Sequence, residues 1–150
     1  MDGAETDEKQ MMTRWLAWLV ALTLAAGTAQ ADPCRAIPDR GPLPAHLRPG
    51  AVVQGPVSYV GDGDSLCVAL GPSPEQWVEI RLADFYAPEL REAGGAEAKA
   101  QLERLTRGRR LTCRIQKQSY DRAVARCELN GVAVGDLLRR AGAKEGGRGR

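Results

Sequence analysis

The sequence predicts a small, mainly β domain of the α+β class: a five-stranded β-barrel with one helix between strands three and four and a short helix at its carboxyl end. Two observations lead to this prediction. Five short stretches are strand-like and bounded by turn residues, whereas two stretches have helical periodicity. A chain of 150 residues is also long enough for one domain with a modest core, but not for two once a leader is removed.

Three predicted strands precede the first helix, at Val57–Val60, Ser65–Leu70 and Trp77–Ala83. The third alternates most clearly, with Val78, Ile80 and Leu82 on one face and Glu79 and Arg81 on the other. We therefore expect a half-buried strand that directs Glu79 and Arg81 away from the core.

The first helix is predicted at residues 95–108, where Ala98, Leu102 and Leu105 recur at helical spacing and Gly108 can end the helix. Two strands follow, at Leu111–Ile115 and Ala123–Leu129, joined by a polar loop at Gln116–Arg122. A second helix is expected at Val134–Ala141. Three strands, a helix, two strands and a helix form the element order of an OB-fold barrel.

Residues 1–31 predict a cleaved signal peptide. The apolar run Trp15–Ala26 follows a positive residue, and a small-x-small cleavage site ends at Ala31. An uncleaved membrane anchor is the alternative, but the run is shorter than the about 20 apolar residues that span a bilayer. The acidic residues before Met11 and Met12 do not suit a signal peptide, so we expect translation to start at one of these methionines. We expect a periplasmic or secreted protein that leaves the membrane after cleavage.

The rest of the chain divides into three parts: an irregular, proline-rich lead-in at 32–50, the barrel domain at 51–143 and a disordered basic tail at 144–150. The formal net charge of +2 rises to about +4 without residues 1–31. A mild basic excess favours polyanions such as nucleic acids, although a merely soluble surface explains it equally well.

All four cysteines follow the predicted cleavage site, in a compartment where disulfides persist. If Cys113 and Cys127 lie opposite each other in the hairpin, the same register sets apolar residues opposite apolar residues, so a Cys113–Cys127 disulfide is reasonable; two unbonded buried thiols are the alternative. Cys34 and Cys67 are then paired by elimination, with Cys67 pointing away from the core. A zinc site is disfavoured, because the chain has no CxxC pair and one histidine.

Three polar motifs stand out: GDGDS at 61–65, RLADFYAPE at 81–89 and YDRAVAR at 120–126. Each alone is explained by a turn or a solvated surface. Together, and in this order, they closely resemble the staphylococcal nuclease (thermonuclease) family over about residues 52–143. The resemblance lies in the turn Asp62-Gly63-Asp64, the spacing from Arg81 to Pro88-Glu89, the helix at 95–108, Tyr120 and Arg122-Ala123-Val124-Ala125, and Asn130-Gly131 before the last helix.

The resemblance implies a calcium-dependent phosphodiesterase, an endonuclease of thermonuclease type, that hydrolyses DNA and/or RNA. Glu89 would orient or deprotonate the attacking water, and Arg81 and Arg122 would bind the phosphate and stabilise the transition state. Tyr120 would hydrogen-bond a phosphate or lie against a nucleotide. The chemistry is sound by itself, because guanidinium groups offer forked, always-charged donors to the negative charge that develops at phosphorus.

The resemblance also implies a metal site, from which this sequence departs. Asp64 would ligate the metal directly, and Asp62 would help to hold a metal-bound water. Apart from the resemblance, the Ala87 carbonyl is a candidate for a further ligand. The family has an aspartate where this chain has Tyr86, and a neutral phenol is a poor calcium ligand, so we expect weakened calcium binding. Asp84 lies on the same strand parity and is a candidate for a substitute ligand.

Two other functions stay open. The chain ends soon after the second helix and lacks the family's third helix and base pocket, which favours a nucleic-acid-binding OB-fold module with little or no catalysis. A disulfide-stapled envelope scaffold or interaction domain is the third interpretation. In each case we expect a monomer with no obligate protein partner.

Overall fold

The structure, a computed structural model, describes residues 32–146. The predicted signal peptide and residues 147–150 of the predicted tail lie outside the described residues. The described chain forms strands β1 (Val52–Val60), β2 (Ser65–Ala69), β3 (Trp77–Leu82), β4 (Arg110–Ser119), β5 (Arg122–Leu129) and β6 (Val132–Ala133), helices α2 (Gly95–Thr106) and α3 (Val134–Arg140), and the short 3-10 helices η1 (Ala45–Leu47) and η2 (Pro74–Gln76).

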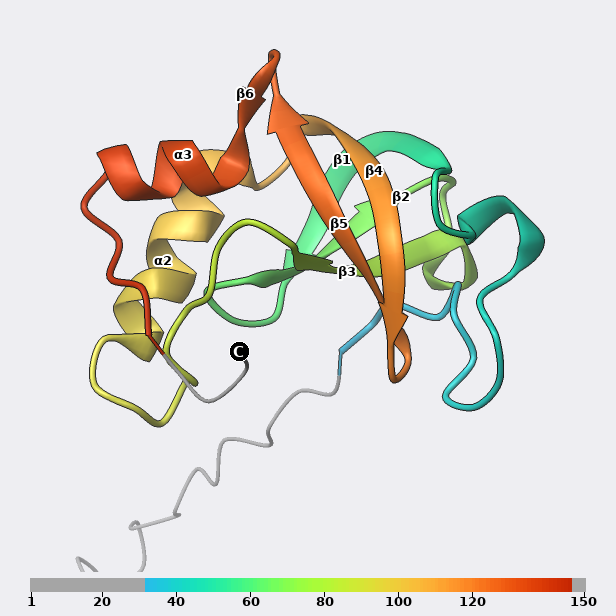
Figure 1. Ribbon diagram of the computed structural model, residues 1–150, viewed down its shortest axis with the longest axis horizontal. Helices are drawn as coiled ribbons and strands as arrows, with labels where there is room; N and C mark the ends of the chain where they lie inside the picture. Colours follow the sequence, from blue (N-terminus) through green and yellow to red (C-terminus); the bar gives the residue numbers. More distant parts are fainter. Residues whose placement is uncertain (1–31, 147–150) are drawn as a thin grey trace, which may run out of the picture. The chain divides into compact units, whose positions relative to one another are not determined.

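The sheet closes on itself as a barrel. Its strands follow the order β3-β2-β1-β4-β5-β6, and a further pairing of β3 with β5 joins the two sides. That closing ladder is parallel and pairs Ile80 with Ala123 and Leu82 with Ala125, whereas the other ladders are antiparallel. The prediction of a mainly β, α+β domain with a five-stranded barrel is confirmed, and the two-residue strand β6 extends it (Figure 1).

Both α-helices lie at the same side of the barrel (Figure 1). In the chain, α2 follows β3 and precedes β4, and α3 follows β6. Ala98 and Leu102 of α2 and Leu138 of α3 are buried in the core. Burial of these apolar residues, rather than helix propensity, accounts for most of the stability of such short helices.

Strand β3 has the alternation that the sequence predicts. Val78, Ile80 and Leu82 are buried at 0–1% exposure, while Glu79 and Arg81 are half-buried on the opposite face. The prediction of which residues face outward is therefore confirmed. The outward direction of these two residues matters for function, because it places Glu79 and Arg81 side by side on the outer surface of the barrel.

The β4–β5 hairpin is longer than predicted. The residues expected as a polar loop, Gln116–Arg122, are mostly strand, because β4 runs to Ser119 and β5 begins at Arg122. The expected register is present, with Cys113 opposite Cys127, but it shifts by a bulge after Ile115. Polar residues in a hairpin satisfy their backbone through the ladder while their side chains face water, so polarity alone misidentified this segment.

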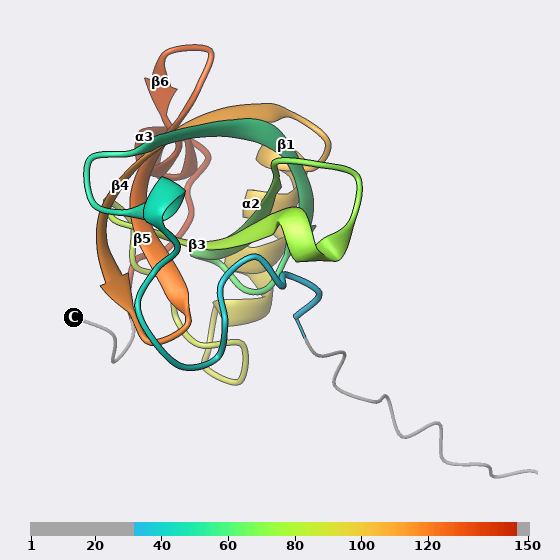
Figure 2. The same cartoon turned by 90° about the vertical axis from the view of Figure 1, so that its right-hand side faces the viewer.

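The lead-in at 32–50 contributes to the core. Ile37, Leu43 and Leu47 are buried against the barrel, and the Arg35 and Ala36 N–H groups donate to the carbonyls of Pro74 and Trp77. The segment is irregular as expected, with η1 as its helical turn, but packing as well as Cys34 holds it to the domain (Figure 2).

The structure contains the two expected disulfides, Cys34–Cys67 and Cys113–Cys127. Cys67 is fully buried although its side chain points to the outer face of β2, because the lead-in covers it. The described start of the predicted tail is also ordered, since Glu145 pairs with Arg139 and the Gly146 N–H donates to the Tyr86 carbonyl. No helix within residues 32–146 is long and apolar enough to cross a membrane.

Candidate functional site

The turn between β1 and β2 brings two carboxylates together. The backbone N–H of Asp64 donates to Asp62 Oδ1 at 2.9 Å. Gly63 between them has no room for a side chain, since a Cβ there would lie 2.4 Å from the Cβ of Ala87 and 2.6 Å from the Cβ of Ala98. Close packing against the segment after β3 and against α2 therefore fixes this turn.

Asp64 is buried, at 4% exposure, although it is a carboxylic acid. Its Oδ2 accepts a hydrogen bond from the Ala87 N–H at 3.1 Å and lies 3.6 Å from Arg81 Nη2. Burial, followed by the charge of Asp62, raises the pKa of Asp64 to about 6, while Ala87 and Arg81 act in the opposite direction. These partners thus offset only part of the cost of burying the charge.

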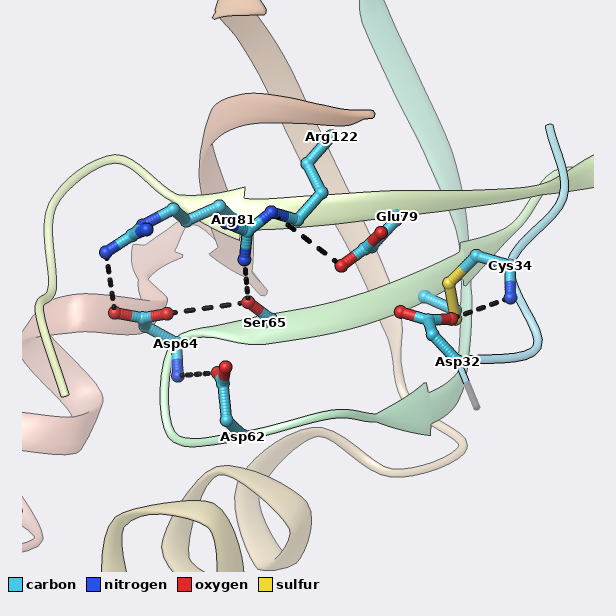
Figure 3. Close-up of polar contacts among 9 residues, drawn as sticks. Asp32, Cys34, Asp62, Asp64, Ser65, Glu79, Arg81 and Arg122 are labelled. Carbon is cyan, nitrogen blue, oxygen red and sulfur yellow. Dashed lines mark hydrogen bonds and ion pairs between the residues drawn. A yellow bond between two sulfur atoms is a disulfide. The ribbon is translucent and has the colours of Figure 1, made fainter. Parts of the chain in front are cut away.

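Arg81 and Arg122 come from different strands and meet at two neighbouring residues where the turn enters β2, Asp64 at the end of the turn and Ser65 at the start of the strand. Arg81 pairs with Asp64, and Arg122 Nη1 donates to the hydroxyl of Ser65 at 3.1 Å. The Ser65 hydroxyl in turn lies 3.5 Å from Asp64 Oδ1, so one chain of contacts joins both guanidinium groups. Figure 3 shows the two arginine side chains approaching Asp64 and Ser65. The parallel ladder between β3 and β5 makes this approach possible.

Two acidic residues that sequence reasoning missed lie on the far side of Arg122. Glu79 Oε1 is 3.8 Å from Arg122 Nε, and Asp32 lies beside Glu79 next to the Cys34–Cys67 disulfide (Figure 3). The signal was present in the sequence, because Glu79 shares the outward face of β3 with Arg81. Asp32 is also close in sequence to Cys34, which was expected to bond to Cys67.

Glu89 lies in the loop between β3 and α2, and within residues 32–146 no hydrogen bond or ion pair joins its carboxylate to the two arginines. Its side chain is exposed, and within residues 32–146 its carboxylate has no hydrogen bond or ion pair. Its backbone is well held: the Glu89 N–H donates to Glu92 Oε2, and the Glu89 carbonyl accepts from the Glu92 N–H at 2.8 Å. Gly95 allows this loop to pack on the start of α2, since a Cβ there would lie 1.9 Å from the Glu89 oxygen.

Asp84, the candidate for a substitute metal ligand, points elsewhere. Its Oδ2 lies 3.8 Å from Arg126 Nη1, and its carboxylate packs against Gly135 at the start of α3. The carboxylate is therefore directed toward α3 instead of toward the turn of Asp62 and Asp64, and the expectation that it joins them is not supported. The physical reason is that β3 ends at Leu82, so strand parity no longer fixes the direction of residue 84.

Ala87 and Tyr86 take structural roles in this arrangement. The Ala87 N–H contacts Asp64, whereas the Ala87 carbonyl, the other candidate for a metal ligand, stays a prediction. Tyr86 is partly buried, and its carbonyl accepts from Gly146.

Tyr120 stands at the tip of the β4–β5 hairpin. It is 87% exposed and adopts a left-handed backbone conformation with φ of 55°. An aromatic side chain in this conformation is unfavourable both for the backbone and for hydration. The tyrosine at this position is therefore explained neither by turn formation nor by core packing.

The carboxylates of the site suit a divalent cation in charge and chemistry. The site contains more carboxylates than guanidinium groups, four to two. The carboxylates are those of Asp32, Asp62, Asp64 and Glu79. Asp62 and Asp64 are hard oxygen donors from one turn, and burial together with the neighbouring Asp62 charge raises the pKa of Asp64. A calcium ion held by this pair would need other oxygens, such as those of water, to complete the six to eight that the ion takes.

Fold and site together define a small, closed, mixed β-barrel with two helices that carries paired arginines beside paired aspartates on its outer face. No protein-family model matches the sequence, and no curated protein matches it.

Proposed function

We propose that this protein is an exported, metal-assisted nuclease of the staphylococcal nuclease-like, OB-fold type, which hydrolyses phosphodiester bonds in DNA and/or RNA. The observation that carries the proposal is the convergence of Arg81 and Arg122 on Asp64 and Ser65. These side chains come from three strands and the turn before β2. A merely solvated surface would not require two guanidinium groups to meet beside a buried carboxylate.

The arginines supply the binding and charge stabilisation of the proposed reaction. In-line attack at phosphorus develops negative charge on the nonbridging oxygens, and a guanidinium group donates to such oxygens in a forked geometry. Arg81 and Arg122 are largely buried, at 18% and 21% side-chain exposure, so water screens them less than it screens surface charges. Their present carboxylate and hydroxyl partners are exchanged in part for phosphate when substrate binds.

Glu89 is the proposed general base. Its carboxylate is exposed and has no hydrogen-bond or ion-pair partner among residues 32–146, so it is available to accept a proton from water. Catalytic hydrogen bonds are often absent before substrate binds, and its present distance from the arginines is therefore compatible with this role. The anchored loop backbone limits how far Glu89 can move.

Asp62 and Asp64 are the residues that would hold calcium, and the bound ion would polarise the phosphate and lower the pKa of the attacking water. Tyr86 replaces a carboxylate in the expected ligand set, so we propose that affinity for the ion is weak. Tyr120, exposed at the hairpin tip, is the proposed contact with a phosphate or a nucleotide base.

We also propose that the protein is exported and monomeric. The two disulfides support an oxidising compartment, either the periplasm or the cell exterior.

The test is digestion of single-stranded DNA, duplex DNA and RNA by the oxidised protein with calcium, with magnesium and with EDTA. We expect cleavage with calcium, none with EDTA, and a loss of at least about 100-fold in kcat for Glu89→Gln with oligonucleotide affinity retained. Glu97→Gln is the matched control, since Glu97 is an exposed carboxylate on the neighbouring helix α2. Cleavage that survives Glu89→Gln would refute the role of Glu89, and no cleavage under any condition would refute the enzyme.

A non-catalytic nucleic-acid-binding OB-fold module is the second candidate. One observation favours it: Arg81 and Arg122 already face Asp64 and Glu79, while within residues 32–146 no hydrogen bond or ion pair joins the Glu89 carboxylate to them. A binding module would tolerate Glu89→Gln in every assay, and its affinity for an oligonucleotide would fall with salt.

A further inference from the structure

Glu79 makes a contact with Arg122 that the proposed reaction does not use. Glu79 lies on the outward face of β3, and its Oε1 is 3.8 Å from Arg122 Nε. The two side chains are 17% and 21% exposed, so solvent screens this pair less than a pair at the open surface. The charge of Glu79 therefore acts directly on Arg122.

The Cys34–Cys67 disulfide holds a second carboxylate over Glu79. Cys67 is directly opposite Glu79 on the neighbouring strand β2, and its bond to Cys34 brings the lead-in onto this position. Asp32 Oδ1 accepts the Cys34 N–H at 2.7 Å and lies 3.3 Å from Cys67 Sγ. Figure 3 shows the Asp32 side chain next to the disulfide on the same side of the sheet as Glu79.

Two neighbouring carboxylates disfavour each other's ionisation, because like charges repel. Burial, followed by the charge of Asp32, raises the pKa of Glu79 to about 8, and Arg122 acts in the opposite direction. Glu79 thus changes from mostly neutral to mostly ionised within a pH range in which proteins are readily studied.

Other groups around Glu79 do not provide this titration. Arg122 on β5 stays charged, and Asp121 in the turn before β5 adds a smaller negative influence. On β2 the facing residue is Cys67, which does not titrate because it is disulfide-bonded. Arg81, the next outward residue of β3, is paired with Asp64.

We propose that Glu79 is a positioning residue for Arg122, and that its ionisation controls how readily Arg122 binds a phosphate group. The inference rests on the proposed function in one respect, since it takes Arg122 as a phosphate-binding residue. With Glu79 neutral, Arg122 stays directed toward Ser65 through the 3.1 Å hydrogen bond, and its other N–H groups can bind an anion. With Glu79 ionised, the carboxylate and the phosphate compete for the same guanidinium group.

The test uses sulfate as a probe, because its charge stays constant between about pH 6.5 and pH 9.5, where Glu79 is expected to titrate. Binding of sulfate to the full chain in EDTA is followed by NMR at the Nε–Hε signal of Arg122, which is assigned by its absence in Arg122→Lys. We expect the dissociation constant to rise roughly fivefold across this range, the size of effect that a partly screened ion pair produces.

Three variants separate positioning from a structural role. Glu79→Gln should bind sulfate with the low-pH affinity of the wild type at every pH, and Glu79→Asp should restore the pH dependence. Asp32→Asn should shift the midpoint to lower pH, because it removes a charge that raises the pKa of Glu79. Glu103→Gln is the control, since it removes an acid that pairs with another arginine, Arg107, and it should keep the wild-type profile.

Two results would overturn the inference: the same pH dependence in Glu79→Gln as in the wild type, or no saturable shift of the Arg122 signal with sulfate at any pH. Neither depends on turnover. If sulfate binding follows Glu79 but no nucleic acid is cleaved, the proposed nuclease fails and this inference stands. If cleavage occurs but Glu79→Gln leaves sulfate binding unchanged, the inference fails and the nuclease stands.

Discussion

Asp64 and Arg81 form an ion pair in which Arg81 Nη2 lies 3.6 Å from a buried carboxylate oxygen. The pair is unbalanced, because burial and the charge of Asp62 keep the pKa of Asp64 at about 6 in spite of Arg81. The ionised Asp64 therefore lowers the stability of the folded protein, and the rest of the barrel must offset this loss. Such losses are common where residues serve function instead of stability.

We expect Asp64→Asn to stabilise the protein at about pH 8 in EDTA by roughly 1–2 kcal/mol, because it removes a buried carboxylate whose pKa is raised to about 6. Loss of the pairing with Arg81 limits the gain. The folded state binds the Asp64 proton more tightly than the unfolded chain does. Its contribution to stability is thus complete below the unfolded pKa of about 4 and is lost as the pH rises through about 6. The advantage of the variant should disappear near pH 4.

Urea unfolding at both pH values measures this effect, with the exposed Asp39→Asn as control. A variant that is less stable than the wild type at both pH values would show that Asp64 is a structural carboxylate.

We expect Gly63→Ala to destabilise the protein by about 1–3 kcal/mol, because its Cβ would clash with the Cβ atoms of Ala87 and Ala98. The matched control lies in the same turn: at Gly61→Ala the nearest atom to the new Cβ is 3.7 Å away, and this change should be nearly neutral. Thermal unfolding measures both. Equal stability of the two variants would contradict the packing of the turn against α2.

The two disulfides should contribute unequally to stability. Cys34–Cys67 spans a sequence separation of 33 residues and Cys113–Cys127 one of 14, so the entropy of loop closure favours the first by roughly 0.8 kcal/mol. Replacing each pair by two alanines and comparing denaturant unfolding tests this order. The β4–β5 ladder, in which Cys113 lies opposite Cys127, also holds the hairpin together without the disulfide. A larger loss of stability on removing Cys113–Cys127 than on removing Cys34–Cys67 would contradict the expectation.

Tyr120→Gly should raise stability by about 0.5–1 kcal/mol, because glycine adopts a φ of 55° without the steric cost that tyrosine bears. The same change should weaken binding of a single-stranded oligonucleotide by roughly 1–3 kcal/mol if the ring stacks on a base. Chemical unfolding measures the change in stability, and fluorescence anisotropy measures the change in affinity. Unchanged affinity would remove Tyr120 from the proposed substrate surface.

Much of the architecture could be predicted from local sequence patterns. The alternation in residues 77–83 and the helical spacing of Ala98 and Leu102 depend on side-chain periodicity alone, so the sequence was sufficient to indicate which residues of β3 face outward. The opposition of Cys113 and Cys127 followed likewise, because the period of two in a strand fixes register once one face is apolar.

Other features depended on contacts between segments far apart in the chain. Residues 116–119 are polar and still form strand, because their ladder partners lie beyond the turn. Asp84 turned toward α3 and Arg126, since no strand parity constrains it after Leu82.

The chain by itself thus determined a mainly β barrel with outward Glu79 and Arg81, and it supplied the residue types on which the proposed phosphate-binding site depends. Only the tertiary structure decided that Glu79 faces Arg122, that Asp32 joins them through the Cys34–Cys67 disulfide, and that Asp64 is buried. The physical reason is that a strand's period sets which face a side chain occupies, whereas its neighbours, burial and pKa depend on how the strands pair and on what covers them.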